Sequence, residues 1–205
     1  QEPNGIHAVW KLNRTTHAII GTHRFNQGTD ININFINDNV FDPGRDVLLV
    51  NTEVGLYRID TNTMALTTPV PSVIDLGAGQ MVACSAIDTV NGYAYFGTTQ
   101  TPGKIIKVAY SNHTTQPLFK EATLTFTDLN DRDIDAMSID ETHGFLYAAT
   151  DTIPLRLIKV SLSTFQKVNT LIGQTNENGA AALFMDVPND KFYAVTLWNT
   201  SAVPG

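Results

Sequence analysis

The chain has 205 residues, of which 42% are hydrophobic and 16% charged, and its formal net charge is −7. This length and apolar content suit one or at most two domains with a substantial core, and the acidic balance argues against nucleic acid or anionic lipid as a partner. No apolar run approaches the roughly 20 residues that a membrane helix needs, and the single cysteine, Cys84, excludes an internal disulfide.

Two strands are predicted near the N-terminus, over residues 8–12 and 17–25, because short apolar runs there are bounded by polar turn residues. The first of them carries Lys11 between apolar neighbours. Because the chain begins at Gln1 rather than Met, we expect a processed or excised piece whose signal peptide is gone.

One skeleton then recurs four times, with an Asp followed ten residues later by a Thr, in residues 42–52, 88–98, 140–150 and 186–196. Each copy predicts a β-hairpin, because an apolar run precedes the Asp and an apolar run rich in β-formers follows the turn. Gly or Asp occupies the turn position where a left-handed backbone is expected. We expect the recurring Asp to hold the turn by accepting backbone N–H bonds.

A third and a fourth strand are predicted after each of the first three hairpins. The third carries a basic residue between apolar ones, as residues 8–12 do: Arg58, Lys107 and Lys159. The fourth is predicted over residues 64–70, 118–126 and 165–172. Four short strands in each unit, with anchors 46, 52 and 46 residues apart, are the signature of a propeller blade.

The sequence therefore predicts an all-β fold: a single β-propeller domain over residues 1–205, with four blades of four-stranded antiparallel sheet anchored at Asp42, Asp88, Asp140 and Asp186. Residues 1–38 would complete the blade that residues 180–205 begin, which closes the ring and leaves no free edge. The alternative is that the chain is part of a larger propeller. A sequence that ends between the second and third strands of a blade would then only mimic closure of the ring.

The segment 56-LYRIDTNTMAL-66 resembles the YVTN-type repeat of surface and secreted propellers, in which a strand ending in Ile-Asp precedes a Thr-rich turn. Residues 91–108 and 157–168 are similar to tandem YVTN-like or NHL-like propeller repeats in secreted proteins of protists and bacteria. The first unit departs from this pattern, since it is shorter between Thr52 and Arg58 and lacks a Gly-Tyr pair. The resemblance implies a fold and an extracellular setting, and it supplies no activity.

The four repeated aspartates, Asp42, Asp88, Asp140 and Asp186, are the sharpest candidate site. In a closed ring their carboxylates could converge on a calcium ion in the central channel. The favoured interpretation is a turn cap, with Asp88 paired to Lys107 and Asp140 to Lys159, because a repeated pair is what a structural motif produces. The acidic segment 128–135 is interpreted as a solvated loop, and Cys84 as a packed inner residue.

The predicted function is that of a noncatalytic extracellular propeller that serves as a protein- or glycan-interaction module or as an assembly module. One such role would be a structural subunit of an extracellular filament or surface layer. The alternative is a calcium-dependent propeller hydrolase or lactonase with a metal in the channel. Enzyme status stays open, and the absence of a repeat-breaking catalytic set favours a nonenzyme; Ca²⁺ is the one candidate cofactor. Secretion as a surface or extracellular glycoprotein is predicted from three sequons, at Asn13, Asn112 and Asn199.

Overall fold

The computed structural model describes residues 7–25, 36–53, 55–67, 81–110, 118–175 and 177–198. Its regular structure is 16 strands and one short 3₁₀ turn, so the prediction of an all-β fold is confirmed. No helix in these ranges is long and apolar enough to span a bilayer.

Three sheets are four-stranded and antiparallel, with their strands in chain order. The first comprises β3 (Ile36–Asp42), β4 (Val47–Thr52), β5 (Gly55–Asp60) and β6 (Ala65–Leu66). The second comprises β7 (Val82–Asp88), β8 (Tyr93–Thr98), β9 (Lys104–Ala109) and β10 (Phe119–Thr125). The third comprises β11 (Ile134–Asp140), β12 (Phe145–Thr150), β13 (Arg156–Ser161) and β14 (Gln166–Ile172). We call these sheets blades 1, 2 and 3.

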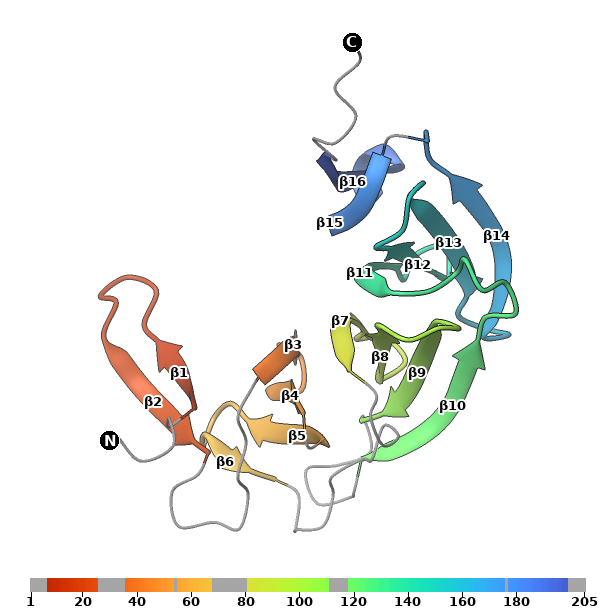
Figure 1. Ribbon diagram of the computed structural model, residues 1–205. Coiled ribbons are helices and arrows are strands. Elements are labelled where there is room, and N and C mark those ends of the chain that lie inside the picture. The colour runs from red at the N-terminus through yellow and green to blue at the C-terminus, as the bar shows by residue number, and fades with distance from the viewer. Residues whose placement is uncertain are drawn as a thin grey trace, which may run out of the picture.

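Two further sheets have two strands each. The N-terminal one pairs β1 (Ala8–Leu12) with β2 (Ile19–Arg24), and the C-terminal one pairs β15 (Glu177–Asp186) with β16 (Lys191–Trp198) through the 3₁₀ turn η1 (Val187–Asn189). Figure 1 shows them at opposite ends of an open arc, with the three blades between them. Within the described ranges no strand pairing joins the two, so the closed ring stays a prediction. One predicted boundary is wrong, since Ile36–Asp42 is the first strand of blade 1 and not part of a closing blade.

The predicted hairpin turns owe their shape to one left-handed residue each. Gly92 and Gly144 have φ of 74°, and Asp46 and Asp190 take φ of 54° and 50° at the same turn position. Gly adopts this conformation freely, and Asp tolerates it because its short polar side chain bonds locally. The prediction of a left-handed position in all four turns is confirmed.

A second repeated feature lies on the innermost strands, which line the inner side of the arc in Figure 1. The pairing register slips by one residue at Asn37, Ala83, Asp135 and Ala181. Each of these residues lies five positions before its repeated Asp. A bulge of this kind bends a strand and increases its twist, so the same kink recurs wherever the chain enters a hairpin.

The core consists of apolar layers between neighbouring sheets. Leu49 and Leu56 of blade 1 pack with Phe96 and Ile106 of blade 2, which are fully buried. Blades 2 and 3 share a larger cluster that includes Tyr95, Ile105, Leu124, Ile158 and Val160. Smaller clusters join β1–β2 to blade 1 and blade 3 to β15. Every described sheet is therefore held mainly by the apolar face of its neighbour.

Candidate functional site

Three of the four repeated aspartates accept hydrogen bonds from backbone N–H groups of their own turns. Oδ1 of Asp42 lies 2.9 Å from Gly44 N, and Oδ1 of Asp88 lies 2.8 Å from Asn91 N. Oδ1 of Asp140 lies 3.0 Å from His143 N. Asp186 differs, because its carboxylate accepts from the side-chain amide of Asn189, at 3.0 and 2.9 Å.

Asp42 also joins two blades. Its Oδ2 accepts hydrogen bonds from Arg45 Nη1 at 2.6 Å and from Tyr110 Oη, which follows the third strand of blade 2, at 2.8 Å. Burial alone would raise the pKa of Asp42, but the bonds from Arg45, Tyr110 and Gly44 outweigh it and hold the pKa below its ordinary value. The same burial, with the bond to Asp42, raises the pKa of Tyr110 far above its usual range.

The aspartates are thus engaged as structural groups. Among the described residues no three His, Cys, Asp or Glu side chains gather so that they could hold a metal ion. Calcium binding by Asp42, Asp88, Asp140 and Asp186 stays a prediction. A calcium titration followed by thermal unfolding tests it, because an ion that binds the folded chain raises Tm further as its concentration rises above Kd.

The predicted pairs Asp88–Lys107 and Asp140–Lys159 are wrong. Lys107 Nζ lies 3.0 Å from Glu121 Oε1 and 3.7 Å from the ring centroid of Tyr93. Lys159 Nζ lies 3.6 Å from the ring centroid of Phe145. In blades 2 and 3 the basic residue of the third strand therefore lies over an aromatic ring of the second strand, an attractive cation–π contact.

The interpretation of segment 128–135 as a solvated loop is wrong for Asp131. This carboxylate is fully buried, and it lies 2.7 Å from both Arg156 Nε and Lys167 Nζ. Asp128 adds a contact of 2.6 Å to Arg156 Nη2. The loop is therefore pinned to β13 and β14, since a buried carboxylate requires such partners.

Cys84 lies on the inner strand of blade 2, as interpreted from its small and apolar neighbours. It is buried, and its Sγ donates to the carbonyl oxygen of Ile134 in blade 3 at 3.2 Å. Burial raises the pKa of the Cys84 thiol well above its ordinary value. The thiolate that nucleophilic chemistry needs is therefore disfavoured.

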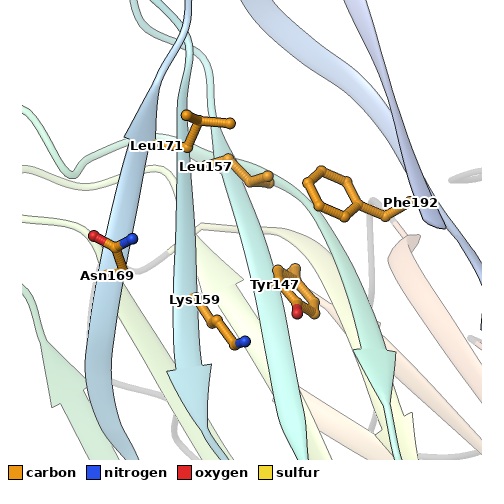
Figure 2. A pocket seen from close by; sticks show the side chains of 6 residues that line it. All are labelled: Tyr147, Leu157, Lys159, Asn169, Leu171 and Phe192. Carbon is orange, nitrogen blue, oxygen red and sulfur yellow. The ribbon is translucent and has the colours of Figure 1, made fainter. Parts of the chain in front are cut away.

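An open apolar pocket of about 250 Å³ lies between blade 3 and β16. We call it the blade-3 pocket; it is lined by Tyr147, Leu157, Lys159, Asn169, Leu171 and Phe192. Figure 2 shows five of these side chains on β12, β13 and β14, with the ring of Phe192 facing them from β16. The rings of Phe192 and Tyr147 stack, with centroids 5.4 Å apart and planes at 24°.

The strand register explains why these residues share one face. Tyr147, Lys159 and Asn169 are directly opposite one another across β12, β13 and β14, and Leu157 is opposite Leu171. The sequence analysis missed this pocket. Its signal was available in the apolar and basic alternation of residues 157–171, but that alternation does not say which side of the blade lacks a neighbour.

The remaining predicted site residues are the sequons. Asn13 lies in the turn between β1 and β2, where its Oδ1 accepts from the N–H groups of Thr15 and Thr16, both at 2.9 Å. Asn112 and Asn199 lie outside the described residues, as does the side chain of Trp198. Glycosylation at the three sequons stays a prediction.

Comparison with solved structures identifies the fold. A chain of the nidogen–laminin complex matches with TM-score 0.62 and 16% identity, over 92% of this chain and 66% of that one. The Cps50 (Swd1) β-propeller domain of Myceliophteria thermophila matches with TM-score 0.62 and 15% identity, over 80% of this chain and 50% of that one. The WD40 repeats of RRP9 match with TM-score 0.58 and 14% identity, over 78% of this chain and 50% of that one.

The chain thus has a β-propeller fold and spans about half to two thirds of the length of these solved chains. No protein-family model and no curated protein sequence matches it. The narrower YVTN-like or NHL-like assignment stays a prediction.

Proposed function

We propose that this chain is a noncatalytic β-propeller that binds other proteins and acts as an assembly module outside the cell. The observation that carries the proposal is the apolar face at the blade-3 pocket, where Leu171 is 62% exposed beside Phe192 and Tyr147. An exposed apolar patch with aromatic side chains is typical of a protein contact surface.

The regularity of the repeat supports a noncatalytic role. Asp42, Asp88 and Asp140 are engaged by their own turns, and the buried Asp131 is engaged by two cations. A catalytic group would instead be left free to meet a substrate. One neighbour in fold was solved in the nidogen–laminin complex, and the shared fold supports a similar general use here.

An affinity capture from extracellular medium of the source cells tests the proposal. We expect the wild-type chain to retain a protein that Leu171→Asp loses, because a charge at this position cannot be buried in an apolar contact. Val90→Asp is the matched control, since Val90 is 68% exposed and lies on the β7–β8 turn, away from the pocket. Equal retention by both variants, or turnover of a defined substrate by the purified chain, contradicts the proposal.

The extracellular setting is supported by the three sequons and by the repeat resemblance. The test is the intact mass of the native protein, compared with the 22.4 kDa of this sequence before and after enzymatic removal of N-glycans. We expect a loss of mass in sugar increments, reduced by one glycan in Asn13→Gln. A native mass that deglycosylation leaves unchanged contradicts the prediction of a glycoprotein.

Glycan binding and a filament subunit are two narrower forms of the proposal; exposed aromatic side chains such as Trp10 support the first, and the repeat resemblance supports the second. Binding of the purified chain to immobilised glycans tests the first. Sedimentation tests the second, because open-ended head-to-tail association gives species of steadily rising mass with concentration.

A further inference from the structure

The blade-3 pocket exists because one face of blade 3 lacks the cover that the same face of blade 2 has. Leu124 and Ile105 are opposite one another in blade 2, as Leu171 and Leu157 are in blade 3. Leu124 is 9% exposed, whereas Leu171 is 62% exposed. Two positions that match in the repeat therefore differ in what lies against them.

At the earlier interface the cover comes from the outer strands of the next blade. Ile158 and Val160 of β13 pack in the cluster with Leu124 and Ile105, and both are fully buried. The sheet that follows blade 3, β15–β16, has no third or fourth strand within the described residues. Nothing described there takes the place of Ile158 and Val160.

The N-terminal hairpin β1–β2 has the register of a third and fourth strand. In blade 3, Ile158 is opposite Thr170, Lys159 is opposite Asn169, and the register slips directly after Lys159. In β1–β2, Trp10 is opposite Thr22, Lys11 is opposite Gly21, and the register slips directly after Lys11. Trp10 and Leu12 therefore hold the positions of Ile158 and Val160.

These two residues are exposed, unlike their counterparts. Trp10 is 60% exposed and Leu12 is 53% exposed. The opposite face of the hairpin is already used, because Val9 packs against blade 1 and Lys11 Nζ donates to the carbonyl oxygen of Thr61 at 2.8 Å. The free face of β1–β2 thus carries the residues that cover a blade, and the blade-3 pocket is the face that lacks them.

We propose that β1–β2 of a second copy docks beside β16 and seals the blade-3 pocket with Trp10 and Leu12. This inference rests on the proposed function, for it names the partner of the same apolar face. A second copy is favoured over the same chain, because Figure 1 places β1–β2 and β16 at opposite ends of the arc. The part of each copy that matches, 78–80% of this chain, covers 50–51% of three propeller neighbours, so two matched parts together have the extent of one such chain.

The hairpin of one copy meets the pocket of the other, and a twofold axis repeats this contact in the opposite sense. The two contacts together form an isologous interface that closes a ring of two copies. In each, β16 would gain β1 as a third strand, which pairs an edge that is otherwise open to other chains. Tyr193 would then face Lys11, as Tyr147 faces Lys159 in blade 3.

Sedimentation equilibrium of the purified full chain with Trp10→Glu and Leu171→Glu tests this arrangement. We expect the wild type to dimerise at micromolar concentration and each variant to dimerise at least about tenfold more weakly, because either glutamate is buried without a partner. An equimolar mixture of the two variants should form dimers more tightly than either variant alone, since the mixed dimer keeps one intact contact and confines both glutamates to the other. Val90→Glu is the matched control and should dimerise as the wild type does.

A monomeric wild type at about 100 μM, or a mixture that forms dimers no more tightly than either variant alone, overturns the inference. The proposed function survives that result if the monomer still captures a partner through Leu171. Variants that each add one cysteine, Lys11→Cys and Tyr193→Cys, give a second readout, because their mixture should form a cross-linked dimer under mild oxidation. A cross-link only within the Lys11→Cys/Tyr193→Cys double variant means closure inside one chain and also overturns it. Cys84 should form few competing disulfides, because its thiol is buried and burial raises its pKa.

Discussion

Tyr110 shows how one side chain links the turn of one blade to the next blade. Its hydroxyl donates to Asp42 Oδ2 at 2.8 Å and lies 3.4 Å from the carbonyl oxygen of Asp88. Tyr95, on the second strand of the same blade, is fully buried and its Oη has no hydrogen-bond partner among the described residues. Both hydroxyls are therefore buried, but only that of Tyr110 has hydrogen-bond partners to compensate for its loss of water.

We expect Tyr110→Phe to lower the free energy of unfolding by about 1.5–3 kcal/mol, the usual contribution of a buried hydrogen bond to a charged group. Tyr95→Phe should change it by less than about 0.5 kcal/mol or raise it, because it removes a desolvated hydroxyl that bonds to nothing described. Urea unfolding at neutral pH measures both. Equal losses in the two variants would show that ring packing, and not the bond to Asp42, is what the substitutions disturb.

Two carboxylates of β11 should respond to pH with opposite signs. Burial raises the pKa of Asp140, but the backbone N–H and side chain of His143 outweigh it, so the net pKa is lowered. Burial, with Asp151 and Asp133 nearby, raises the pKa of Asp135. Ionised Asp140 therefore stabilises the fold at pH values above its ordinary pKa of 3.8, and this stabilisation is lost as the pH falls through its lowered, folded-state pKa. Ionised Asp135 costs stability at all pH values above its raised pKa.

We therefore expect Asp140→Asn to lower Tm at pH 7 and Asp135→Asn to raise it. The difference for Asp135→Asn should fade as the pH falls from the raised pKa of Asp135 to the ordinary value of 3.8. The difference for Asp140→Asn should begin to fade only below 3.8, as the pH falls toward the lowered pKa of Asp140. Thermal unfolding followed by circular dichroism between pH 7 and pH 3 gives both curves. A pH-independent change in Tm would instead indicate that the amide disturbs the turn or the bulge by its shape.

At the scale of elements, the loop between β10 and β11 is held by charge as much as by packing. Asp131 lies under Arg156 of β13 and Lys167 of β14, and its backbone carbonyl accepts from Gly103 N at 2.9 Å. A Cβ on Gly103 would lie 2.6 Å from that same carbonyl oxygen, so only glycine permits the approach. The loop thus joins the outer strands of blade 3 to blade 2.

We expect Asp131→Asn to destabilise the chain by about 3–5 kcal/mol, because it breaks a buried ion pair: Lys167 loses its carboxylate and Arg156 keeps only Asp128. Asp133→Asn is the matched control in the same loop; its contact to Arg132 is long, at 3.6 Å, and largely exposed. The Asp133→Asn control should lower the free energy of unfolding by less than about 1 kcal/mol. Chemical denaturation at low and high salt separates the two, and a similar small loss for both would mean that the buried cluster contributes little.

At the scale of the whole molecule, the sequence predicts what is local and repeated. The ten-residue spacing from Asp to Thr predicts the hairpins, and Gly92 or Asp190 predicts the left-handed turn, because both depend only on neighbouring residues. The exposure of Leu171 could not be predicted in this way, since Leu124 matches it in the repeat and is buried. The difference is set by the sheet that lies opposite, which is distant in sequence. Asp131 escaped prediction for the same reason, as its partners lie 25 and 36 residues away.

This dependence on neighbours predicts an uneven stability along the chain. Central strands β4, β5, β8, β9, β12 and β13 are paired on both sides and lie between apolar layers, whereas β1, β2, β15 and β16 belong to two-stranded sheets. Two-stranded sheets are marginal in water unless something covers them. We therefore expect amide hydrogen exchange in a dilute sample to be slowest in the six central strands and fastest in the two terminal sheets.

The same measurement at rising protein concentration shows whether the second copy supplies the missing cover. We expect exchange in β1 and β16 to slow by at least about tenfold as dimers form, because each strand gains a hydrogen-bonded neighbour. Exchange in β8 and β9 should not change, and Leu171→Glu should remove the concentration dependence. Strong protection of β1 and β16 at the lowest concentration would place their cover within a single chain. The ring would then close by the strand exchange that the sequence predicts, without a second copy.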